Sequence, residues 1–220
     1  MTKPYRYLRA DGVPVAHPLF QAERGGSIPT SALQLRFDRE TVDVARELNA
    51  LWHSVLPNIA KQNIKGGGPF HVCYSAEHDG GYYAAAIWST PRAVNRMRWD
   101  PHEVLELRRF AIAMQAPKNT ASRMLGWMVR DIRRRFPSVC VLVSYQAEDN
   151  HVGTIYKASG WKPGPRTEFR PWTHKGGSPT QSTSAKVRWE LQIRKTNSEG
   201  RPVSLPQCVS ATQQTLGLTA

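Results

Sequence analysis

The sequence predicts a mixed α/β or α+β fold, in which helices cover the faces of a mixed β-sheet. The first observation is the order of the expected elements from about residue 70 onward, which is strand, strand, strand, helix, strand, helix, strand. The second is that strands and helices do not alternate regularly, as they do in doubly wound nucleotide-binding folds. The third is that both G-x-G-x-x-G and G-x-x-x-x-G-K-[ST], the phosphate loops of such folds, are missing.

The first part of the chain predicts few regular elements. Residues 1–36 mix proline, glycine and tyrosine without a clear period, so we expect an irregular lead-in with a short strand near Leu33–Arg36. Asp38 is expected to cap a helix that runs to about Val55, because apolar residues recur there at steps of three and four. Residues 65–69 are rich in glycine and predict a loop.

A β-hairpin is expected next. Residues 70–75 and 81–89 are short of charge, and the turn-forming residues 78–81 lie between them. Pro91–Met97 follows as a short helix.

The strand Val104–Ala113 contains two arginines. Strict alternation along this strand predicts which side chains share a face. One face would carry Leu105, Leu107, Arg109 and Ala111, and the other Glu106, Arg108, Phe110 and Ile112.

A long amphipathic helix is predicted from Thr120 to Phe136, where Pro137 ends it. Its apolar stripe is Met124, Met128, Ile132 and Phe136. The elements after it are a buried strand at 138–145, a short helix from Asp149–His151 to Gly160, and strands at 169–172 and 187–193 around a Gly/Ser/Thr-rich loop at 173–185.

The charge of the chain is strongly positive and clustered. The 220 residues hold 30 Lys and Arg against 17 Asp and Glu, a formal net charge of +13. All of this excess lies in residues 105–136 and 157–195, since the rest of the chain is balanced. Clustered cations favour a polyanionic partner such as nucleic acid. For Arg133–Arg135 alone, a solvated helix end is an equally good interpretation.

Other classes of protein are not indicated. The longest apolar run, Tyr82–Trp88, is far shorter than the roughly 20 residues that span a membrane. The N-terminus lacks the apolar core of a signal peptide, so we expect a cytoplasmic protein. The cysteines Cys73, Cys140 and Cys208 are far apart and form no C-x-x-C, which argues against a disulfide framework and a zinc ribbon.

The junction between the strand at 104–113 and the helix at 120–136 could bind a phosphate. A helix N-terminus offers unpaired N–H groups and a positive dipole, and two cations and two hydroxyls lie within this junction. The junction residues are Lys118, Asn119, Thr120, Ala121, Ser122 and Arg123. Simple helix capping by Asn119, Thr120 or Ser122 is the alternative.

The segment from 138 to 161 resembles the closing motif of the GCN5-related N-acetyltransferases (GNAT). The matching residues are Asp149-Asn150-His151 and, after them, Ile155-Tyr156-Lys157-Ala158-Ser159-Gly160-Trp161. The resemblance implies a largely antiparallel central sheet with helices on both faces, and acetyl-CoA or a related acyl-CoA as cofactor. The family's phosphate loop is Q/R-x-x-G-x-G/A, and here Asn119 replaces the first glycine while Ala121 fills the last position. Asn tolerates the left-handed backbone better than other non-glycine residues.

A narrower resemblance, to the Mom family of bacteriophage DNA-modification proteins, covers roughly residues 70–195. The segments that match are LELRRFAIA, APKNTASRML, RRRFP, SYQ, HVGTIYKASGW and KVRWE, in this order. The resemblance implies transfer of an acyl-derived, methylcarbamoyl or acetamido-type group to N6 of adenine in DNA, which protects phage DNA from restriction. It also implies a GNAT-like catalytic domain, which we place at 37–195. Beyond Thr196 the chain is polar and interrupted by prolines, so a flexible tail is expected at 196–220.

The two resemblances, together with the clustered charge, name the candidate site residues. Tyr156 corresponds to the tyrosine that can protonate the departing CoA thiolate, and Arg109, Ser122 and Asp149 are the other catalytic candidates. For Arg109, a salt bridge to Glu103, Glu106 or Asp149 is the alternative. The cofactor candidates are Ile112, Ala113, Lys118, Asn119, Thr120, Ala121, Ser122 and Arg123. The DNA-binding candidates are Lys157, Arg166, Arg170, Trp172, Lys186 and Arg188.

Several questions stay open at the level of sequence. The Mom resemblance also suggests iron, but no spacing of His, Cys, Asp or Glu selects a set of ligands, so no metal site is assigned. DNA is the expected partner, a membrane is not, and a homodimer is one alternative for the oligomeric state. The rival functions are a GNAT enzyme acting on a small molecule or protein, and a DNA-binding protein without enzymatic activity.

Overall fold

One seven-stranded sheet organises the protein. The computed structural model describes residues 27–53, 59–65, 68–91, 99–148, 152–167 and 185–194. The strand order is β1-β2-β3-β4-β5-β7-β6, and every neighbouring pair is antiparallel except β4–β5. The strands are β1 (Arg36–Glu40), β2 (His71–His78), β3 (Gly81–Ser89), β4 (Val104–Ile112), β5 (Val141–Ala147), β6 (Lys162–Thr167) and β7 (Lys186–Gln192).

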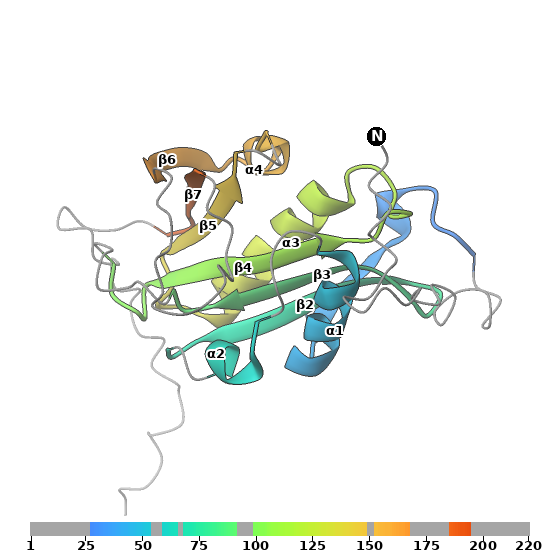
Figure 1. The fold of residues 1–220 in the computed structure, drawn as a ribbon, viewed down its shortest axis with the longest axis horizontal. Helices are drawn as coiled ribbons and strands as arrows, with labels where there is room; N and C mark the ends of the chain where they lie inside the picture. Colours follow the sequence, from blue (N-terminus) through green and yellow to red (C-terminus); the bar gives the residue numbers. More distant parts are fainter. Residues whose placement is uncertain are drawn as a thin grey trace, which may run out of the picture.

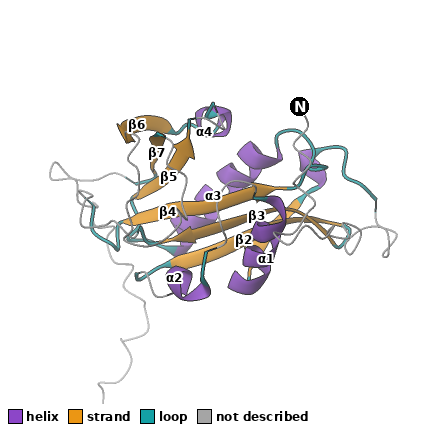
Figure 2. Ribbon diagram, viewed as in Figure 1, coloured by secondary structure: helices purple, strands orange, loops and turns teal. Residues whose placement is uncertain are grey.

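Helices cover both faces of this sheet (Figures 1 and 2). The helices are α1 (Val42–Trp52), α2 (Lys61–Lys65), α3 (Thr120–Arg135) and α4 (Thr154–Ala158). On β2, Cys73 belongs to a core cluster with α1, whereas Tyr74 belongs to the main cluster with α3. Because neighbouring strand residues point to opposite faces, α1 and α3 lie on opposite sides of the sheet. The mixed, largely antiparallel sheet with helices on both faces is therefore confirmed.

Several predicted elements are present at their expected places. The hairpin of β2 and β3 turns at Asp79 and Gly80, both of which have positive φ. Helix α3 has the predicted stripe, since Met124, Met128 and Ile132 are fully buried. None of the helices in the described ranges is long and apolar enough to cross a membrane.

The prediction for the start of the domain was wrong in detail. The strand expected near Leu33–Arg36 begins only at Arg36, as β1, and the residues before it form a short 3₁₀ helix, Ala32–Gln34, whose N-terminus is capped by Ser31. Asp38 lies within β1, opposite Ser75, so it cannot cap a helix. The cap of α1 is Thr41, whose hydroxyl accepts a hydrogen bond from the N–H of Val44.

The alternation predicted for β4 was also wrong in its second half, because β4 contains a β-bulge. Ile87 pairs with Arg109 but the next residue, Trp88, pairs with Leu107, so Arg108 is an extra residue. Leu105 and Leu107 pack in the main cluster with α3, while Ala111 packs against α1 on the other face. The bulge therefore moves Arg109 from the face of Leu107 to the face of Glu106.

The end of the domain differs from the prediction at three elements. Strand β5 begins at Val141 rather than 138, and α4 begins at Thr154, after Gly153 in a left-handed conformation. Strand β6 was not predicted, because it contains Pro163 and Pro165. These prolines are compatible with a strand at the edge of the sheet that pairs irregularly with β7. The elements predicted at 91–97, 169–172, 173–185 and 196–220 lie wholly or mostly outside the described residues.

Candidate active site

The two parallel strands at the centre of the sheet separate along their length. Val104–Leu107 pairs with Val141–Ser144, and the pairing ends there. Beyond this point β5 continues to pair with β7, and β4 continues to pair with β3. Figure 1 shows β5 turning away from β4, with α4 beside it. Between the diverging strands, the edge of β4 from Arg108 to Ile112 faces no strand of the described chain.

The N-terminus of α3 follows directly after the free half of β4. Asn119 has φ of 68° and takes the left-handed conformation that its replacement of glycine requires. The hydroxyl of Ser122 donates to the carbonyl of Asn119 at 3.2 Å, and that of Thr120 donates to the carbonyl of Pro117 at 2.7 Å. No side chain caps this helix. Within the described chain, the N–H groups of Ala121 and Ser122 have no hydrogen-bond partner, which is the arrangement that accepts an anion.

The cationic candidates near this helix end differ in their placement. Lys118 is exposed on the loop before the helix. The guanidinium of Arg123 instead donates to the carbonyl of Ala32 at 2.9 Å and lies over the ring of Phe37. Arg123 therefore attaches the N-terminal segment to α3. Of the remaining cofactor candidates, Ile112 packs against the main cluster, and Ala113 is buried with its N–H bonded to the carbonyl of Tyr83.

Tyr156, on α4, is a buried tyrosine. It is 8% exposed, and its ring stacks on Trp189 with centroids 5.3 Å apart. Its hydroxyl lies 2.8 Å from the hydroxyl of Ser144. Burial raises the pKa of Tyr156, so the phenol is protonated at neutral pH.

Ser144 is a site residue that the sequence did not reveal. It is the last residue of β5 that pairs with β4, opposite Leu107, and its hydroxyl also lies 3.4 Å from the carbonyl of Leu107. The Tyr156 hydroxyl is therefore fixed at the point where the two strands separate. A small hydroxyl residue directly after the apolar run Val141–Val143 is the signal that could have identified Ser144.

A second group of polar residues lies on the opposite face of the sheet. Glu106 and Arg108 form an ion pair with Oε1 and Nε 3.4 Å apart, and burial raises the pKa of Glu106 while Arg108, Arg109 and Lys186 oppose this rise. Burial also lowers the pKa of Arg109 to about 10. The pKa of Lys186 is lowered too, and burial is again the main cause. The structure thus brings together Arg109, expected near the reaction, and Lys186, expected to bind DNA.

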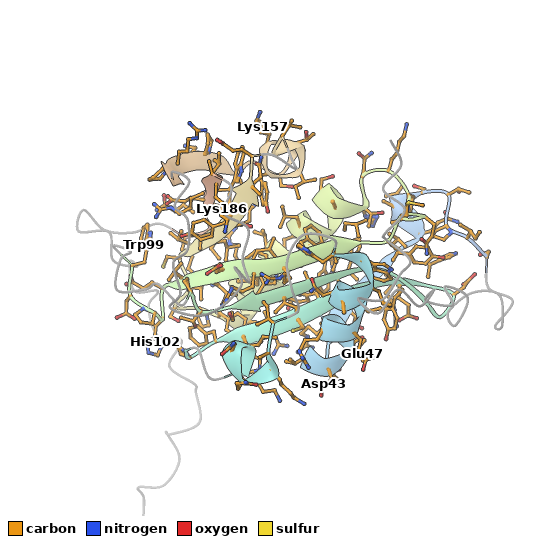
Figure 3. All side chains as sticks on the ribbon, in the orientation of Figure 1. Asp43, Glu47, Trp99, His102, Lys157 and Lys186 are labelled. Atoms are coloured by element: carbon orange, nitrogen blue, oxygen red, sulfur yellow. The ribbon has the colours of Figure 1, made fainter. Side chains whose placement is uncertain are left out.

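The other predicted DNA-binding residues are more dispersed. Lys157 is exposed on α4, whereas Lys186 is the first residue of β7 and pairs with Ala147 at the end of β5 (Figure 3). Arg166 is exposed and bonded to Glu148, with the closest atoms 2.6 Å apart. Arg188 is half-buried and ion-paired with Glu190 at 2.5 Å. Asp149, Arg170 and Trp172 lie outside the described residues.

The described ranges offer no site for iron. They contain no group of three or more His, Cys, Asp or Glu side chains close enough together to hold a metal ion. No iron site is therefore assigned among the residues that the structure describes.

Comparison with solved structures identifies the fold. A Bacillus subtilis acetyltransferase in complex with CoA has a TM-score of 0.50 at 13% identity, over 72% of this chain and 98% of that chain. A putative GNAT acetyltransferase from Desulfovibrio desulfuricans has a TM-score of 0.52 at 14% identity, over 72% and 99%. A putative acetyltransferase from Salmonella typhimurium with acetyl-CoA has a TM-score of 0.51 at 9% identity, over 76% and 98%. With its separating central strands, the protein has the GNAT acetyltransferase fold.

The particular family is given by sequence. Residues 83–200, more than half of the chain, match the model of the Mom protein family. The protein therefore belongs to that family. No curated protein sequence matches it.

Proposed function

We propose that this protein is a DNA-modification enzyme. It transfers an acyl-derived, methylcarbamoyl or acetamido-type group to N6 of adenine in phage DNA, and so protects that DNA from host restriction. The observation that supports this most is the alignment of three features within the Mom family fold. The central strands separate at Leu107 and Ser144, the Tyr156 hydroxyl lies at that point, and an uncapped helix N-terminus follows the free half of β4.

An acyl-CoA is the donor that these residues fit. Its pyrophosphate would be bound by the free N–H groups of Ala121 and Ser122 and by the exposed Lys118. Its pantetheine would run along the unpaired edge of β4, whose backbone groups need hydrogen-bond partners. A thioester supplies an activated carbonyl carbon. CoA and acetyl-CoA are bound by two of the structural relatives named above, which is consistent with this donor.

Tyr156 is the general acid in this proposal. Its phenol is protonated because it is buried, and its orientation is set by Ser144 on one side and the Trp189 ring on the other. A positioned acid of this kind contributes roughly 10²–10⁴-fold to a rate. Ser144 is a positioning residue, since its contacts are with Tyr156 and the backbone of β4.

The acceptor must reach the site unpaired. The amino group of adenine is conjugated with the ring and is base-paired in a duplex, so an enzyme that modifies it extrudes the base or takes it from a single strand. The clustered positive charge of the chain supports binding of the flanking phosphates. Part of that charge is unavailable, because Arg166 and Arg188 are already paired with Glu148 and Glu190.

The test is to express the protein in cells that carry a plasmid and to analyse the digested nucleosides by mass spectrometry. The expected result is a new deoxyadenosine derivative with added acyl-derived mass, absent from cells with the empty vector. Unmodified adenine would contradict the proposal.

The structural neighbours favour a second candidate, an N-acetyltransferase that acts on a small molecule or a protein. It predicts turnover of acetyl-CoA that does not depend on added DNA. A third candidate, a DNA-binding protein without a donor, predicts salt-dependent DNA binding and no thermal shift with acetyl-CoA. Acetyl-CoA turnover with and without DNA, DNA binding, and the thermal shift with acetyl-CoA together separate the three functions.

A further inference from the structure

Tyr145 is an aromatic residue at the point where the central strands separate. It directly follows Ser144, the last residue of β5 that pairs with β4. Its side chain lies on the same face of the sheet as that of Glu106, because Val143, two residues earlier, is the strand partner of Glu106. Tyr145 is half-buried, so part of its ring is open to a bound molecule.

The neighbours of Tyr145 hold its ring in place. Tyr145 pairs with Arg188 of β7, and its hydroxyl is hydrogen-bonded to the side chain of Arg188. Arg188 is itself ion-paired with Glu190 at 2.5 Å. Burial raises the pKa of Tyr145, so the ring is uncharged at neutral pH. A ring that is already fixed loses little conformational freedom when a flat molecule stacks on it.

The tryptophans near the separating strands are not available for stacking. Trp161 and Trp189 are 3% exposed and pack against Tyr156 in the main cluster, on the opposite face of the sheet. Trp99 is on the face of Tyr145, but it is 8% exposed and belongs to an apolar cluster there. Of the aromatic residues described on β4, β5 and β7, Tyr145 is therefore the one with open ring surface on this face.

The charge around Tyr145 suits a nucleotide. Cations outnumber carboxylates on this face by two, since Arg108, Arg109, Lys186 and Arg188 gather there with Glu106 and Glu190. Each nucleotide of a DNA strand carries one negative phosphate. A nucleotide whose base lies on the ring of Tyr145 therefore brings charge of the sign that this face lacks.

We infer that the extruded acceptor base stacks on the ring of Tyr145, which positions its amino group for the reaction. This inference rests on the proposed function. Tyr145 is one residue beyond Ser144, a step of about 3.3 Å along the strand, so a stacked base lies beside the point where the strands separate. An extruded base loses its stacking in the duplex, and an aromatic ring in the site replaces it. Stacking holds the plane of the base and leaves its edge, with the amino group, free to meet the donor.

The experiment compares Tyr145→Leu, Tyr145→Phe and a matched control, Tyr82→Leu. Tyr82 is also half-buried, and its hydroxyl donates to Glu40 at 3.1 Å, toward the β1 edge of the sheet. The affinity of each full-length variant is measured by fluorescence anisotropy for a single-stranded oligonucleotide of deoxyadenosine and for an abasic strand of the same length, at one salt concentration. The abasic strand keeps the phosphates and lacks every base, so the difference between the two affinities reports contacts with bases.

A stacking contact predicts a loss that depends on both the ring and the base. Tyr145→Leu should bind the deoxyadenosine strand roughly 5–150-fold more weakly than the wild type, and the abasic strand equally well. Tyr145→Phe keeps the ring and should keep both affinities, as should Tyr82→Leu. The rate of adenine modification in plasmid DNA should fall for Tyr145→Leu and stay near the wild-type rate for Tyr145→Phe. The thermal shift with acetyl-CoA should be the same for all variants.

Three results would overturn this assignment and leave the proposed function intact. They are a Tyr145→Leu protein with the wild-type affinity for the deoxyadenosine strand, an equal loss for the abasic strand, and a Tyr145→Phe protein that loses as much as Tyr145→Leu. If Tyr145→Leu does not fold, Tyr145→Met takes its place with the same expected losses, because a flexible apolar side chain fills the space without a ring. A wild-type protein that modifies no adenine would overturn the proposed function, whereas the binding measurements decide the stacking contact by themselves.

Discussion

Tyr156→Phe separates the chemical role of Tyr156 from its structural role. The variant removes one hydroxyl and leaves the ring stacked on Trp189. The lost interaction is the hydrogen bond with Ser144, which keeps the carbonyl of Leu107 as a partner at 3.4 Å. A neutral hydrogen bond of this kind contributes about 1 kcal/mol net, so we expect the free energy of unfolding to fall by about that amount. For a chain of this size the thermal midpoint should fall by roughly 2–4 °C.

The effect on the reaction should be much larger. Loss of a general acid lowers a rate by roughly 10²–10⁴-fold, far more than so small a loss of stability could cause. The assay is the rate of adenine modification in plasmid DNA, measured with the thermal midpoint of the same preparation.

Tyr74→Phe is the matched control for this prediction. Tyr74 is fully buried, and its hydroxyl donates to the carboxylate of Asp131 at 3.0 Å, away from the separating strands. A hydrogen bond to a charged group is worth about 1.5–3 kcal/mol, so this variant should be the less stable of the two and yet retain the rate. A Tyr156→Phe protein with the wild-type rate, or a Tyr74→Phe protein that loses as much rate, would refute the general-acid role.

Three further predictions concern positions that the structure makes unusual. Gly153→Ala should lower the free energy of unfolding by roughly 1–3 kcal/mol, measured by urea denaturation. The φ of Gly153 is +72°, and a Cβ there would collide with Trp189 and Gln146. An unchanged urea midpoint would contradict this. Asn49→Leu should raise the urea midpoint. Asn49 is 1% exposed, and neither polar atom of its amide has a hydrogen-bond partner in the described chain, which costs the folded state about 1–3 kcal/mol. A lower midpoint would count against this reasoning. Asn119→Gly should preserve the thermal shift that acetyl-CoA produces, whereas Asn119→Val should reduce it, because a φ of 68° strains a β-branched residue. Equal shifts for the two variants would show that the left-handed backbone at this position is not required.

Elements whose signals are local were predicted well. The spacing of Met124, Met128 and Ile132 is set by the helix period, so α3 was predicted to within a residue. The β2–β3 hairpin follows from the turn residues between two apolar runs. Predictions failed where a residue suits one element by its local sequence but takes part in another through pairing with a distant strand. Asp38 is an acceptable helix cap in isolation, but pairing with β2 places it in a strand.

Part of the candidate site was named from the sequence. Tyr156 was named from the family resemblance, and its hydroxyl lies beside Ser144, where β5 stops pairing with β4. The residues from Asn119 to Ser122 were named because they begin a helix, and they lie at the N-terminus of α3, after β4. Ser144 was not named as a site residue. A serine within an apolar strand has an ordinary structural interpretation. Its importance depends on where β4 and β5 stop pairing, and no local pattern reports that point.

The sequence by itself determined the class of fold, the positions of α3 and of the β2–β3 hairpin, the family and the clustering of positive charge. These properties depend on short-range periodicity, turn chemistry and composition. Only the tertiary structure decided which side chains act together. The bulge at Arg108 moves Arg109 to the face of Glu106, and pairing with β7 brings Lys186 to the same place. Such contacts depend on the register between strands distant in the chain, where an offset of one residue exchanges the two faces of the sheet.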